Sequence, residues 1–188
     1  MKITASMRIA VLLILALGLA LRVAHAEIEK FAVPAAKGKS FHWWPKLPPL
    51  KGWRHDREQS LHYGINALAP DGSTFADAET VMYAKAVHKP QRPESKTLER
   101  FIESDKKASL NRSPDIVVQE GAALSTADGR KLRSFTFFPR RSGNWERVSY
   151  GEEGDFYLVF AVSSRSLAGY KAAEKAYVQL IRSYKEKP

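Results

Sequence analysis

The chain has 188 residues, which suits one domain with its ends, since domains typically hold roughly 100–200 residues. It contains no cysteine, which excludes disulfide bonds, a lipid-modified cysteine, cysteine-ligated zinc and a cysteine nucleophile. Its 30 Lys and Arg residues against 20 Asp and Glu residues give a formal net charge of +10 at pH 7, so anionic surfaces are the expected partners.

The first 26 residues have the pattern of a secretory signal peptide, with Lys2 and Arg8 as a positive start before the apolar residues 9–21. Residues 24–26, Ala-His-Ala, offer the small residues that a signal peptidase reads. The apolar run is shorter than the about 20 residues that a membrane-spanning helix needs. We therefore predict a periplasmic or secreted protein that starts at Glu27 after cleavage, with an uncleaved anchor as the alternative.

Export also narrows the class of partner. Cleavage removes the cations Lys2, Arg8 and Arg22 and no acidic residue, which lowers the net charge by three, to +7. A basic exported chain suits a protein partner or an anionic part of the cell envelope, with at most peripheral membrane contact. Nucleic acid is not an expected partner after export.

Residues 27–50 have the composition of an extended arm, because they show no apolar period and are interrupted by prolines. Trp43 and Trp44 are adjacent, so they cannot lie on the same face of a strand. One interpretation is a binding or membrane-interface patch, since Trp favours boundaries with one dry side. The other, which we favour, is an arm that packs across the domain through Trp43, Trp44 and Leu47.

A single domain is expected over residues 51–188. Residues 60–69 (SLHYGINALA) alternate between apolar and polar side chains as a strand does, and Pro-Asp-Gly at 70–72 predicts a turn. A second strand is expected at residues 79–88. A helix is expected across residues 96–110, with Ser95 as its N-terminal cap and an apolar stripe of Leu98, Phe101 and Ile102.

Short alternating segments then predict further strands at residues 115–119, 122–126, 132–138 and 144–150. Residues 155–163 (DFYLVFAVS) are apolar on both faces, which is typical of a central strand that is covered on both sides. From Ser166 the apolar period becomes helical. Its stripe consists of Leu167, Tyr170, Ala173, Tyr177, Leu180, Ile181 and Tyr184.

Strands joined by short turns predict a mostly antiparallel β-sheet, and two helices are present to cover its faces. We therefore predict the α+β class, as an α/β/α sandwich.

Residues 51–185 resemble the PsbP-like group, which is named for an extrinsic subunit of photosystem II. The resemblance is carried by Gly52-Trp53, Pro70-Asp71-Gly72 and the aromatic strand before a terminal helix that ends in Leu180-Ile181-Arg182-Ser183-Tyr184, with Ser163-Ser164-Arg165 and Tyr170 between them. It implies an antiparallel sheet between helices and a role in binding or assembly rather than catalysis. It assigns no functional residue and no cofactor.

Histidine and carboxylate residues raise the alternative of a metal-binding protein. His55, Asp56 and His62 are the best candidates as zinc or copper ligands, with His88 further along the chain. No pair has the i, i+4 spacing of a helical metal site, so we expect no metal and no other cofactor. The acidic run Glu152-Glu153-Gly154-Asp155 is interpreted as a charged turn rather than a calcium loop.

Basic residues gather around the predicted hairpins and form the candidate binding surface. Its members are Arg133, Arg140, Arg141, Trp145 and Arg147, with Arg130 and Lys131 beside them. Such a stripe would meet an anionic partner. A hydrolase is the remaining alternative, but no GxSxG motif occurs and Ser163-Ser164 ends an apolar strand. We expect an exported, non-enzymatic binding or assembly protein.

Overall fold

The computed structural model describes residues 28–35 and 38–185. The predicted signal peptide and the predicted mature start at Glu27 lie outside these residues. Among the described helices, none combines the length and the apolar character that a bilayer-spanning segment requires.

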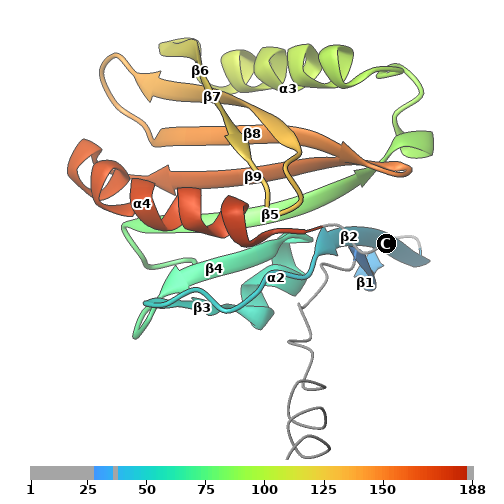
Figure 1. The fold of residues 1–188 in the computed structure, drawn as a ribbon, viewed down its shortest axis with the longest axis horizontal. Coiled ribbons are helices and arrows are strands. Elements are labelled where there is room, and N and C mark those ends of the chain that lie inside the picture. The colour runs from blue at the N-terminus through green and yellow to red at the C-terminus, as the bar shows by residue number, and fades with distance from the viewer. Residues whose placement is uncertain (1–27, 36–37, 186–188) are drawn as a thin grey trace, which may run out of the picture.

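One antiparallel sheet organises the described chain (Figure 1). Its strands follow the order β1-β2-β5-β9-β8-β7-β6. Strand β4 pairs with the same edge of β5 as β2 does, and β3 pairs with β4. The strands are β1 (Ile28–Ala35), β2 (Gly38–Pro45), β3 (Trp53–His55), β4 (Asn66–Pro70), β5 (Thr80–His88), β6 (Ile116–Ser125), β7 (Lys131–Pro139), β8 (Trp145–Glu153) and β9 (Phe156–Ser164).

The helices are α2 (Arg57–Tyr63), α3 (Leu98–Arg112) and α4 (Leu167–Ser183), and a 3-10 turn, η1, spans Lys89–Gln91. Helix α4 lies along β9 and β5, whereas α3 lies beyond β8 and β7 (Figure 1). The α+β class with a mostly antiparallel sheet, predicted from the turn and strand pattern, is confirmed.

Strand β9 is central, as predicted, with β5 on one side and β8 on the other. Successive side chains of a strand point to opposite faces of the sheet. Leu158 and Phe160 accordingly join the core beneath α4, whereas Tyr157 and Val159 join the core beneath α3. The strand is therefore buried on both faces.

Helix α4 begins at a cap formed by Ser166, whose side chain accepts a hydrogen bond from the backbone N–H of Gly169. Its residues Tyr177, Leu180 and Ile181 are fully buried against the sheet. Burying an apolar side chain of this size contributes roughly 1.5–3 kcal/mol, so this stripe supplies a large share of the core energy.

Helix α3 confirms the predicted stripe, because Phe101 and Ile102 are buried against the opposite face. The predicted cap was wrong: Thr97, not Ser95, accepts the hydrogen bond from the N–H of Arg100. Ser95 is instead buried, and its carbonyl oxygen accepts a hydrogen bond from the hydroxyl of Tyr157.

The predicted arm is a β-hairpin. Strands β1 and β2 pair along their length, and Trp43 pairs with Ala86 of β5, which joins the hairpin to the sheet. Trp44 is 1% exposed and stacks on Phe31, so it belongs to the core. Trp43 and Leu47 also pack against the core, so the segment is part of the sheet and not an extended arm beside it.

The strand predicted at residues 60–69 was wrong in its first half, which forms helix α2. Asp56 caps the helix by accepting from the N–H of Gln59, and Gly64 ends it in the left-handed conformation at φ 67°. Only Asn66–Pro70 is a strand. A helix of seven residues is too short to show a 3.6-residue period against an alternating background.

Candidate functional site

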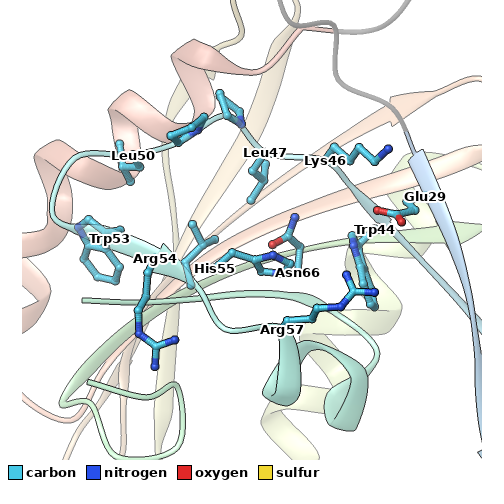
Figure 2. A pocket seen from close by; sticks show the side chains of 13 residues that line it. Glu29, Trp44, Lys46, Leu47, Leu50, Trp53, Arg54, His55, Arg57 and Asn66 are labelled. Carbon is cyan, nitrogen blue, oxygen red and sulfur yellow. The ribbon is translucent and has the colours of Figure 1, made fainter. Parts of the chain in front are cut away.

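A cleft of about 500 Å³ opens where the β2–β3 connection crosses β3, β4 and the start of α2 (Figure 2). The apolar lining residues are Trp44, Leu47, Pro48, Pro49, Leu50, Trp53 and Leu68. The other lining residues are polar, namely Glu29, Lys46, Arg54, His55, Arg57 and Asn66. A mixed lining of this kind suits a ligand that is partly apolar and partly polar.

Asn66 is the central polar residue of this cleft. Its Nδ2 donates a hydrogen bond to the carbonyl oxygen of Pro45 at 2.8 Å, and the residue is only 4% exposed. Its Oδ1 is buried and accepts no hydrogen bond from any residue that the structure describes. A buried acceptor without a partner is costly, so Oδ1 of Asn66 is an unsatisfied polar atom at the base of the cleft.

His55 lines the same cleft, and its Nε2 lies 2.9 Å from Oγ of Ser60. The hydroxyl hydrogen of Ser60 is already donated to the carbonyl oxygen of Asp56 at 2.7 Å. Nε2 must therefore carry the hydrogen of the His55–Ser60 bond, which leaves Nδ1 as the acceptor in the neutral ring. Desolvation, followed by the nearby charge of Arg57, lowers the pKa of His55.

This Ser–His pair is not arranged as a catalytic dyad. A nucleophilic serine needs a histidine that accepts its proton and a hydroxyl that substrate can reach. Ser60 is 0% exposed, donates to a backbone carbonyl, and also accepts from the N–H of Ala67 at 2.9 Å. Its bonds join α2 to β4, which is a structural role.

The cations of the cleft differ in how they are held. Both Nε and Nη2 of Arg54 donate to the carbonyl oxygen of Ser73, and Nη2 lies 3.7 Å from Asp56. Arg57 makes no hydrogen bond or ion pair with any described residue and is exposed. It begins α2, where the helix dipole disfavours a positive charge, so its placement does not serve helix stability.

The predicted metal candidates His55, Asp56 and His62 do not converge. Asp56 is buried, and its two carboxylate oxygens accept from the N–H groups of Gln59 and Phe75. His62 is exposed on α2 and packs edge-on against Tyr63. Across residues 28–35 and 38–185, no three His, Cys, Asp or Glu side chains are grouped to hold a metal ion.

The predicted basic surface is not one continuous stripe. Arg133 pairs with Glu99 of α3 and with Glu120, whereas Arg147 pairs with Glu174 of α4. Since α3 and α4 cover opposite faces of the sheet, Arg133 and Arg147 lie on opposite faces. The stripe that the sequence suggested is therefore split and largely neutralised.

The remaining members of that group lie in the turn between β7 and β8 and at the first residue of β8. Arg141 lies 3.2 Å from Asp115, and Arg140 is exposed. Trp145 is half-buried and stacks on Phe138. These residues leave a small exposed basic turn rather than a broad surface.

Two further sequence candidates have structural partners. Trp43 is half-buried and stacks on His88, so its ring is engaged within the domain. Of the acidic run, only Gly154 and Asp155 form the turn between β8 and β9, whereas Glu152 and Glu153 are the last residues of β8, and Glu152 lies 3.2 Å from Lys89.

Sequence reasoning missed Arg57 and Asn66 as site residues. Arg57 looked like one of many surface cations, because its place at a helix start depended on the undetected α2. Asn66 was assigned to the polar face of a strand, and its burial depends on Pro45, 21 residues earlier. No local signal marks such a contact.

No protein-family model matches the chain, and no curated protein matches it. A similar structure is the crystal structure of a Pseudomonas aeruginosa protein of unknown function, with a TM-score of 0.50 and 10% sequence identity. The match covers 88% of this chain and 99% of that chain. At this identity the likeness shows a shared fold alone.

Proposed function

We propose that this protein is an exported, non-enzymatic binding protein that recognises an extended acidic segment of a partner polypeptide in the cleft around Asn66. The observation that carries the proposal is the buried, unpartnered Oδ1 of Asn66. The PsbP-like resemblance, with its expected α/β/α sandwich and binding role, belongs to the same proposal.

A polypeptide fits the chemistry of the cleft. Its backbone N–H groups are donors, which Asn66 Oδ1 requires. Its apolar side chains would pack against Leu47 and Trp53, and an acidic side chain would meet the exposed Arg57. A carboxylate group offers only acceptors near neutral pH, so on its own it would leave Oδ1 of Asn66 unpaired.

The hydrogen bonds of Ser60, which forms the cleft's only Ser–His contact within the described residues, support binding rather than catalysis. Ser60 is committed to two backbone groups and is 0% exposed. The lining therefore positions groups for recognition and places no reachable nucleophile beside His55.

The test is selection of displayed peptides on the mature protein, followed by calorimetric titration of the best binder. Selected sequences should be acidic with apolar residues interspersed. Arg57→Glu should weaken binding at least tenfold, whereas Arg100→Glu, an exposed position on α3 across the sheet, should leave it unchanged. An equal loss of affinity in both variants would mean that only net charge matters. Unchanged binding in both variants would show that the peptide does not bind in this cleft.

Export is tested separately. We propose that cleavage before Glu27 delivers the protein to the periplasm or exterior. Mass spectrometry of the protein from fractionated cells should give a mature chain that starts at Glu27. A cytoplasmic chain that retains Met1 would contradict export without touching the peptide cleft.

A further inference from the structure

A second polar cleft, of about 470 Å³, lies on the α3 side of the sheet, between the end of that helix and strands β5, β7 and β8. Its polar lining includes Tyr83, Arg112, Asn144 and Glu146, and Phe137 provides an apolar part. Tyr83, Asn144 and Glu146 also line an adjoining hollow of about 300 Å³. The two hollows share this set of side chains.

Glu146 is held in place by a chain of hydrogen bonds. Asn144 Nδ2 donates to Oγ of Ser163 at 3.0 Å, and Ser163 donates to Oε1 of Glu146 at 2.7 Å. Oε2 of Glu146 has no hydrogen bond or ion pair with any residue the structure describes. Burial, aided by the charge of Asp105, raises the pKa of Glu146 more than the Ser163 bond and Arg112 lower it.

Arg112 supplies the opposite charge on the same cleft. It is the last residue of α3, and its Nη2 donates to Oγ of Ser109 at 3.3 Å. Unlike Arg133 and Arg147, it pairs with no carboxylate among residues 28–35 and 38–185. One unpaired cation and one unpaired carboxylate therefore face a common cavity.

Tyr83 completes the polar set. It is half-buried, and its hydroxyl group makes no hydrogen bond within the described part of the chain. The hydroxyl can donate or accept, so it can complete the contacts of either end of a ligand. Phe137, which is 2% exposed, contributes to the apolar lining of the cleft.

We propose that this cleft binds a small zwitterion, an amino acid or short peptide, whose ammonium group meets Glu146 and whose carboxylate meets Arg112. A ligand with only a negative charge would be repelled by Glu146, and a ligand with only a positive charge would be repelled by Arg112. A molecule with both charges compensates both side chains, since charge-assisted hydrogen bonds form at each end. This site is separate from the peptide cleft and does not rest on it.

The experiment is calorimetric titration of the mature protein with glycine, 4-aminobutanoate, 6-aminohexanoate and dialanine, which space the two charges differently. One spacing should bind best, and its N-acetyl and amide derivatives, which each lack one charge, should bind at least tenfold more weakly. No heat from any of the four at about 10 mM, where a millimolar Kd is detectable, would overturn the proposal.

Matched variants assign the two ends. Glu146→Gln keeps an acceptor for Ser163 and removes the charge, and Arg112→Gln removes the cation; each should weaken zwitterion binding at least tenfold. Arg100→Gln on the same helix should leave it unchanged. Thermal melts of each variant show that it is folded.

Three further results would overturn the site as described. These are undiminished binding in both folded cleft variants, equally tight binding of the neutralised derivatives, or loss of binding in Arg165→Gln but not in Arg112→Gln. The last would place the carboxylate in the adjoining hollow, which Arg165 lines.

Discussion

The side-chain amide of Asn66 donates to the carbonyl oxygen of Pro45 at 2.8 Å, so the last residue of β2 fixes the direction of a buried amide on β4. The bond leaves Oδ1 without a partner among the described residues. The N-terminal hairpin thus sets the chemistry of the cleft as well as extending the sheet.

Asn66→Ala should destabilise the protein and weaken peptide binding together. The carbonyl of Pro45 loses its donor, which costs about 1–3 kcal/mol, and removal of the unpartnered Oδ1 offsets part of this cost. Urea denaturation should show a lower midpoint with an unchanged slope. Asn111→Ala, at an exposed position of α3, is the control and should change neither quantity.

Gly64→Ala should be more destabilising than Gly72→Ala. Both glycines have positive φ, 67° and 82°, so an added Cβ strains the backbone at each, by roughly 1–2 kcal/mol. At Gly64 the new Cβ would also lie 2.2 Å from Nδ1 of His42, whereas at Gly72 nothing lies within 4 Å. Thermal unfolding of the two variants measures the difference.

The double variant His42→Ala/Gly64→Ala isolates the contact of β2 with α2. Removing the imidazole should recover the part of the loss that exceeds the Gly72→Ala effect. No recovery would mean that His42 does not pack on Gly64, and the placement of the hairpin against α2 would be wrong.

Asp56→Asn should make the free energy of unfolding less dependent on pH in acid solution. Burial raises the pKa of Asp56, but the N–H groups of Phe75 and Gln59 and the nearby Arg54 outweigh it, so the pKa lies below its usual value of 3.8. A depressed carboxyl pKa stabilises the fold fully above 3.8, and this stabilisation is lost as pH falls below 3.8 towards the folded value.

The free energy of unfolding should therefore fall less steeply between pH 5 and pH 2 in Asp56→Asn than in the natural protein. Asp71→Asn is the control, because the exposed carboxylate of Asp71 makes no hydrogen bond within the described residues. The same pH dependence of the unfolding free energy in all three proteins would show that Asp56 is not the cause of the loss of stability in acid.

Tyr177→Phe tests the polar contact inside the α4 core. The hydroxyl of Tyr177 lies 2.8 Å from Oγ of Ser149 and 2.9 Å from the carbonyl oxygen of Phe160, at 0% exposure. Its removal should lower the free energy of unfolding by about 1–2 kcal/mol. Tyr170→Phe, at a half-buried position, should change it by a few tenths at most.

Periodicity predicted the elements whose burial is decided by their own sequence. Strand β9 is apolar on both faces and α4 carries a long stripe, so both were located from the residues alone. Helix α2 was missed, because Leu61, His62 and Tyr63 in its last turn continue the alternating pattern of the strand that follows.

The candidate sites depend on contacts that no local pattern encodes. Asn66 becomes central through Pro45, and Glu146 through the hydroxyl of Ser163 on the neighbouring strand. The prediction of a basic stripe was wrong for a related reason. Arg133 and Arg147 lie on opposite faces of the sheet and pair with carboxylates on different helices.

The most direct test of peptide recognition is photo-crosslinking in living cells, with a photoreactive phenylalanine analogue in place of Leu47 in the cleft or of Lys107 on the exposed side of α3. The Leu47 position should give a discrete adduct with a partner polypeptide that Arg57→Glu abolishes, and the Lys107 position should give none. No adduct from Leu47, or the same adduct from both positions, would contradict the proposed role of the cleft.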